Sequence, residues 1–135
     1  MDRLQVSVTT AQWQGKPYTV VALAGETDLT TVDRLREALT SPVRHGARLL
    51  IADLSGLGFM DSAGVRTVLQ AVRAAREWGG RLALASPQPV VARVLLLMDV
   101  AELVPVYASV AAAARGMIGG DAAAGDTAAG EPREV

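Results

Sequence analysis

Segment 49–72 changes its hydrophobic period part-way along, and this change constrains the fold more than any other feature of the chain. Residues 49–54 form a nearly unbroken apolar run, which is typical of a strand buried on both faces. Gly56 and Gly58 follow and predict a loop. Apolar residues then recur at helical spacing, at Val65, Val68, Leu69 and Val72. The sequence therefore predicts a buried strand, a loop and an amphipathic helix in direct succession.

Ser62 stands where the predicted loop passes into the helix. We expect its hydroxyl at or beside the N-cap, where it would accept a hydrogen bond from the first turn and contribute about 1 kcal/mol. The same position leaves the hydroxyl exposed enough for a modifying enzyme to reach. From the residues alone, a structural cap and a phosphorylation site both remain open.

Period and turn residues predict the other elements. Strands are expected over 4–9, 18–24, 81–85 and 104–107, with a turn at 14–17. Helices are expected from Thr30 or Thr31 to just before Pro42, over 89–98, and after Ser109 as a cap, while Gly79-Gly80 ends the helix that starts at Ser62. The order predicts an α/β fold, a small mixed sheet of about four to five strands covered by about four helices.

Length and composition indicate one domain with a tail. A chain of 135 residues is long enough for one domain and short for two. We expect this domain over residues 1–117. Residues 118–135 are rich in Gly, Ala and acidic residues and contain no aromatic residue. They cannot bury enough apolar surface to offset their ordering entropy, so we expect a disordered tail.

Charge and residue types exclude several classes of function. The net charge is −1, which argues against nucleic acid as a partner, and the absence of cysteine excludes disulfides and thiolate chemistry. The start of the chain lacks the pattern of a signal peptide, and no apolar run approaches the roughly 20 residues that span a bilayer. We therefore expect a cytoplasmic protein without direct membrane insertion.

Three segments resemble one family. Residues 53–65, which read DLSGLGFMDSAGV, resemble the signature of the STAS domain, specifically that of the bacterial anti-sigma-factor antagonists. Residues 25–29, GETDL, resemble the family's Gly-Glu-Leu-Asp turn, and residues 82–87, LALASP, resemble its last full strand. Met60 stands where the family usually has Ile, and residues 97–100 replace its commoner glycine-containing helix end.

The resemblance implies a function in partner switching during a bacterial stress response. By that resemblance, the unphosphorylated protein binds an anti-sigma factor, which is a serine kinase of the histidine-kinase-like ATPase class, and so frees a sigma factor for transcription. The kinase then phosphorylates Ser62 and releases the antagonist, and a serine phosphatase restores it. The chain would be a substrate and not an enzyme, would need no cofactor or metal, and would be a monomer or weak dimer.

The resemblance also implies a partner-binding surface, which comprises Asp28, Asp61, Ser62, Ala63, Gly64 and Arg66. Asp61 has a second interpretation as a helix-start carboxylate favoured by the helix dipole. Asp28 matches an aspartate that lies near the acceptor serine in the family, but alone it would be an ordinary turn or capping residue. Asp53 is expected to hydrogen-bond nearby amides.

Other functions are less consistent with the residues. Residues 56–61 loosely match a dinucleotide fingerprint, but Asp61 occupies the third glycine position and would repel a pyrophosphate. A catalytic triad would need His45, the only histidine, beside Ser62. Two other roles of STAS domains stay open, namely a scaffold subunit of a stress-signalling assembly and a soluble subunit of a lipid ABC transporter.

Overall fold

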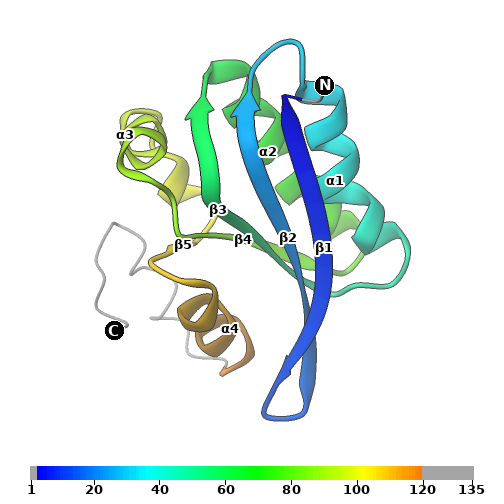
Figure 1. Ribbon diagram of the computed structural model, residues 1–135. Helices are drawn as coiled ribbons and strands as arrows, with labels where there is room; N and C mark the ends of the chain where they lie inside the picture. Colours follow the sequence, from blue (N-terminus) through cyan, green and yellow to red (C-terminus); the bar gives the residue numbers. More distant parts are fainter. Residues whose placement is uncertain (1–2, 120–135) are drawn as a thin grey trace.

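The computed structural model describes residues 3–119, and in this part of the chain a five-stranded sheet is packed between helices (Figure 1). In order, the elements are β1 (Leu4–Trp13), β2 (Lys16–Thr27), α1 (Val32–Arg44), β3 (Leu49–Met60), α2 (Ser62–Glu77), β4 (Arg81–Ala85), α3 (Pro89–Leu97), the 3-10 helix η1 (Val100–Glu102), β5 (Val106–Tyr107) and α4 (Val110–Ile118). The predicted α/β class with a small mixed sheet is confirmed. Most of the tail expected over 118–135 lies outside the described residues.

The sheet is mixed because its first connection is a hairpin and the later ones are crossovers. β1 and β2 pair antiparallel across a turn at Gln14 and Gly15, whose φ angles of 52° and 77° fit the tight turn that matches strand twist. β2, β3, β4 and β5 are all parallel, in the order β1-β2-β3-β4-β5. The carboxyl ends of β2, β3 and β4 therefore meet at one edge of the sheet.

Alternation along the strands divides the core between the two faces. On β3, Leu50 and Leu54 belong to the larger core, which also contains Leu35 of α1 and Val68 of α2. Ile51, between them, belongs to a second core under α4. Figure 1 shows α1 and α2 behind the sheet and α4 in front of its lower part. A strand buried on both faces needs a nearly continuous apolar run such as that of residues 49–54.

The predicted loop at Gly56 and Gly58 is wrong, because β3 continues through both residues to Met60. The register of β3 against β2 shifts twice in this stretch, and the two backbones come close together. A Cβ atom on Gly56 would lie 3.0 Å from the Cβ of Ala24 and 3.1 Å from the carbonyl oxygen of Leu23. The glycine thus permits close approach of two strands rather than a loop.

The ends of α1, α2 and α4 can be compared with the turn and cap residues that the sequence predicted. Pro42 lies inside the last turn of α1 and not beyond it, because the N–H groups of His45 and Ala47 still donate to its carbonyl oxygen and continue the turn past it. Gly79 ends α2 with a φ of 83°, and Ser109 caps α4, both as predicted. Asp99 adopts a φ of 54° after α3, the conformation in which glycine is commonest.

Replacement of Gly56 by alanine tests the close approach of β2 and β3. We expect Gly56→Ala to lower the free energy of unfolding by about 1 to 3 kcal/mol, because backbone atoms must move to accept the methyl group. Gly58→Ala is the matched control, since its Cβ would meet nothing nearer than 3.8 Å. Urea denaturation of both variants measures the difference, and equal stabilities would contradict the interpretation.

Candidate functional site

The first turn of α2 is capped by Asp61 and not by Ser62. Asp61 has extended backbone angles at the N-cap, and its Oδ1 accepts a hydrogen bond of 3.0 Å from the N–H of Gly64. Ser62 is the first residue of the helix, beside the cap, and is exposed. Its hydroxyl makes no hydrogen bond with any of residues 3–119. The expected cap is therefore made by Asp61, the residue beside Ser62, and the serine hydroxyl is left accessible.

Hydrogen bonds join the end of β2 to the start of α2. The N–H of Asp61 donates to the carbonyl oxygen of Thr27 over 3.2 Å, and the Thr27 hydroxyl lies 3.5 Å from the carbonyl oxygen of Phe59, to which it donates. A Cβ on Gly64 would lie only 2.5 Å from the Thr27 Oγ1, so a glycine is needed for α2 to pack this closely. These contacts join Thr27, which precedes Asp28, to Asp61, which precedes Ser62.

Asp28 is held by several hydrogen-bond donors. Its Oδ1 accepts hydrogen bonds from the Thr30 N–H at 2.8 Å and from the Thr30 hydroxyl at 2.6 Å. Its Oδ2 forms an ion pair of 2.8 Å with the guanidinium of Arg3, which also pairs with Glu26. The Thr30 hydroxyl above all, and then the Thr30 N–H and Arg3, lower the pKa of Asp28 despite its partial desolvation. Asp28 therefore stays ionised and orders this loop.

Thr31 completes the order of the same loop. It occupies the N-cap position of α1, as expected, but its hydroxyl does not cap that helix. The hydroxyl instead accepts a hydrogen bond from the N–H of Asp28 at 3.0 Å and donates to the carbonyl oxygen of Glu26 at 3.0 Å. The loop between β2 and α1 is consequently fixed by its own side chains.

The other predicted site residues differ in exposure. Arg66 lies one turn after Ser62, is exposed, and forms no ion pair with the residues that the structure describes. Ala63 and Gly64 are buried, with 8% of Ala63 exposed. The lack of a side chain on Gly64 lets α2 lie against Thr27, and both residues offer little surface of their own.

Two apolar side chains at this edge were missed by the sequence analysis. Leu29 is 76% exposed in the loop after Asp28, and Phe59 is 43% exposed near the end of β3. With Asp61, Ser62 and Arg66 they form what we call the Ser62 surface. An apolar residue in the otherwise polar turn 25–31 was the available signal for Leu29. Phe59 gave no such signal, because its exposure depends on the register shift of β3.

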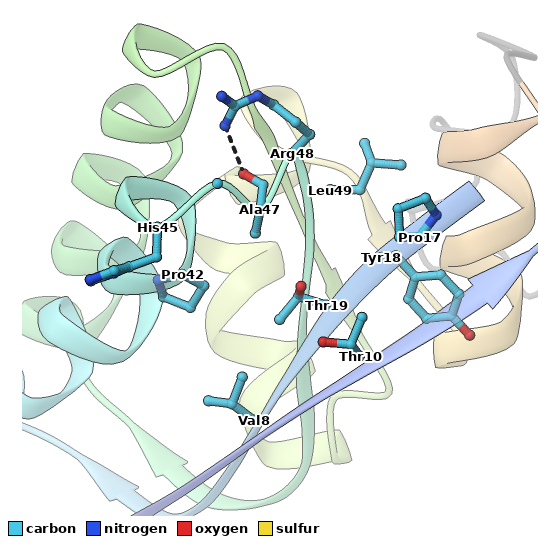
Figure 2. Close-up of a pocket in the computed structure, with 11 residues that line it drawn as sticks. Val8, Thr10, Pro17, Tyr18, Thr19, Pro42, His45, Ala47, Arg48 and Leu49 are labelled. Atoms are coloured by element: carbon cyan, nitrogen blue, oxygen red, sulfur yellow. Dashed lines mark hydrogen bonds between the residues drawn. The ribbon is translucent and has the colours of Figure 1, made fainter.

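A cavity of about 410 Å³ lies at the opposite end of the sheet (Figure 2). Its wall is formed by the β1–β2 hairpin and the segment that leads from α1 into β3. In Figure 2 the His45 ring points away from Thr19, and its Nδ1 lies 2.8 Å from the carbonyl oxygen of Ser41. His45 precedes β3 and Ser62 follows it. The strand has twelve residues and is therefore about 36 Å long at the usual rise per residue. These two residues are therefore not brought together as a triad would need.

Two kinds of feature are absent from residues 3–119. No group of three or more His, Asp or Glu side chains in this range could hold a metal ion. None of the helices there is both long and apolar enough to cross a membrane.

Comparisons with known proteins agree with one another. The model of the STAS domain family matches residues 10–113. An anti-sigma F factor antagonist from Paenibacillus polymyxa is 29% identical over 89 residues, which cover 65% of this chain and 76% of that protein. The solved structure of the anti-sigma factor antagonist SpoIIAA in its unphosphorylated form has 26% identity and a TM-score of 0.64, covering 84% of this chain and 97% of that one. The phosphorylated form of the Bacillus protein SpoIIAA has 25% identity and a TM-score of 0.55, covering 76% and 90%.

The pKa of Asp28 provides a test of the ordered loop. A carboxylate whose pKa is lower in the folded than in the unfolded state stabilises the fold above the ordinary value of about 3.9, and this contribution is lost as the pH falls through the folded pKa. Thr30→Ala removes the donor with the largest effect, so we expect the pKa of Asp28 to rise toward its ordinary value. An NMR titration of the carboxyl carbon measures it, with Thr30→Ser, which keeps the hydroxyl, as control. An unchanged pKa in Thr30→Ala would refute this account.

Proposed function

Because the chain belongs to the STAS domain family, we propose that it is an anti-sigma-factor antagonist whose binding is switched off by phosphorylation of Ser62. In this proposal the unphosphorylated protein binds an anti-sigma factor that is also a serine kinase, and a sigma factor is thereby released. The relatives support the antagonist role by their names. The observation that carries the proposal is the exposed, unbonded hydroxyl of Ser62 on the first residue of α2.

The local structure is compatible with a phosphate on Ser62. Asp61 caps the helix, so modification of the neighbouring hydroxyl removes no hydrogen bond of the fold. A phosphoserine carries about −1.5 to −2 charges at pH 7, and the first turn of a helix is the place where negative charge is best tolerated. The fold should therefore remain intact in both states, and the effect of the phosphate should be felt by the partner.

The Ser62 surface has the composition of a docking site. Leu29 and Phe59, each two residues from one end of the Thr27–Asp61 hydrogen bond, offer exposed apolar area. Arg66 offers a cation that no described carboxylate neutralises. Apolar side chains supply contact area while the charged ones set specificity, which is the usual division of roles at transient interfaces. Asp28 contributes to this surface indirectly, because its hydrogen bonds and ion pair order the loop between β2 and α1 that carries Leu29.

Coulomb's law gives the size of the switch. A doubly charged phosphate about 6 Å from one carboxylate of the partner, at an effective dielectric constant of about 20, is repelled by on the order of 5 kcal/mol. Screening and side-chain movement would reduce this to about 2 to 3 kcal/mol, or about thirty- to a hundredfold in affinity. A local charge change is sufficient, and no large conformational change is needed. A serine phosphatase would return the protein to its binding form.

Three variants test the proposal. Ser62→Ala, used to capture proteins from a lysate of the source organism, should enrich a kinase-like ATPase, and phosphopeptide mass spectrometry of the wild type should find phosphate on Ser62. With the captured partner purified, calorimetric titration should give tight binding for Ser62→Ala. Ser62→Asp should bind about five- to tenfold more weakly, because its single charge is about half that of the phosphate.

Ser7→Asp is the matched control, since it adds the same charge at an exposed serine of β1, away from the Ser62 surface. It should bind as tightly as the wild type. Equal affinities of Ser62→Ala and Ser62→Asp would exclude the charge switch. If the protein instead captures transporter or scaffold subunits, and its Ser62 carries no phosphate, the antagonist role is excluded.

A further inference from the structure

The two edges of the sheet differ greatly in length. At one edge β5 has two residues, Val106 and Tyr107. At the other, β1 has ten residues and pairs with β2 along its whole length without a register shift. No other strand of residues 3–119 pairs with β1. Figure 1 shows β1 as the outermost strand, with the end of the β1–β2 hairpin projecting below the helices. One long side of the sheet is thus open.

The hydrogen-bond pattern identifies which backbone groups face outward. The N–H of Glu26 donates to the carbonyl oxygen of Arg3. The backbone N–H and C=O groups of Arg3 and of every second residue after it therefore point toward β2. Val6, Val8 and Thr10 therefore direct their N–H and C=O groups away from the sheet. The outward carbonyl of Leu4 is already satisfied, since it accepts a hydrogen bond of 2.6 Å from the Nε of Arg34. The free edge runs from Val6 toward the hairpin turn.

This edge lacks the features by which proteins prevent strand pairing. Its sequence, LQVSVTTAQW, contains no charged residue and no proline, and the ladder contains no bulge. β-Branched residues, which favour strand pairing, occupy its centre. Val8, in the middle of the free edge, is 52% exposed. A neutral, regular strand of this length is the kind of edge that proteins cover.

We propose that this edge pairs with β1 of a second copy of the chain, antiparallel about a twofold axis at Val8, so that two sheets become one. In this register Val8 faces Val8 of the second copy, and Val6 faces Thr10. Because β1 is neutral, its own sequence can lie opposite itself without like charges meeting. Arg3, just before the strand, is held by Glu26 and Asp28, and Lys16 lies beyond the paired segment. A twofold homodimer is also the commonest symmetric assembly.

The dimer would be reversible and would leave the Ser62 surface free. One strand pair buries less than the roughly 800 Å² per partner of a standard stable interface, so the dimer should depend on concentration. Antiparallel pairing points the carboxyl ends of β3 in the two copies in opposite directions, and Ser62 follows β3 directly. The two Ser62 surfaces would thus lie at opposite ends of the joined sheet. The proposal does not depend on whether Ser62 is phosphorylated.

Sedimentation equilibrium of the full chain tests the dimer. The apparent mass of the wild type should rise with concentration from monomer toward dimer. Val8→Lys should raise the dissociation constant by about tenfold or more, because two like charges then lie directly opposite each other. Val90→Lys is the matched control, since Val90 is 58% exposed on α3, across the sheet from β1. It should dimerise like the wild type.

Hydrogen exchange identifies the edge directly. The outward amides of Val6, Val8 and Thr10 should exchange slowly at high protein concentration and rapidly at low concentration. Val8→Pro is a second variant that keeps the ladder to β2, because the N–H of Val8 points away from it, and it should also be monomeric. A wild type that stays monomeric at high micromolar concentration would overturn the proposal. A dimer in which these three amides stay unprotected, or which Val90→Lys dissociates instead, would overturn it as well.

Discussion

The close packing of the end of β2 against the start of α2 is the constraint on which the rest of this edge depends. The hydrogen bond from the Asp61 N–H to the Thr27 carbonyl oxygen sets the distance, and only glycine at position 64 leaves room for the Thr27 side chain. β3 meets the same requirement at Gly56, where it runs close to Ala24 of β2. Small residues at these positions let two loops that are far apart in sequence form one surface.

The division of roles between neighbouring residues follows from this packing. Asp61 satisfies an N–H of the helix, and Thr30 and Arg3 hold Asp28, so the carboxylates near Ser62 serve mainly to order the backbone. Ser62 is left with no structural task among the described residues. A hydroxyl in that position can be modified without loss of a hydrogen bond. Because the residues around it are held by their own hydrogen bonds, an added charge would alter the binding of a partner rather than the fold. At one edge of the sheet, β1 pairs with β2 on its inner side, and no other strand of residues 3–119 pairs with its outer side.

Much of the fold could be predicted because it depends on local patterns. The apolar run 49–54, the helical spacing after Ser62, the Gly79 helix end and the Ser109 cap all act within a few residues, and the structure confirms each. Some errors are local, such as the place of Pro42 and the choice of cap at Asp61 or Ser62, whereas others concern residues whose role depends on distant neighbours. Gly56 and Gly58 suggested a loop because the approach of Ala24 cannot be read from the local sequence, and Phe59 was overlooked because a register shift exposes it.

By itself the sequence determined the α/β order of elements and the position of Ser62 at the start of a helix, since hydrophobic period and capping residues act over short range. Only the tertiary structure decided that Asp61 caps that helix, that Asp28 is held by Arg3 and Thr30, and that Leu29 and Phe59 join the same surface. It also decided which strand is left at the open edge. The ion pair of Arg3 with Asp28 and the order of the strands depend on contacts between residues more than twenty positions apart, which leave no periodic trace in the chain. The Asp61 cap is a local contact, but Asp61 and Ser62 are both capping residue types, and only the backbone geometry decides between them.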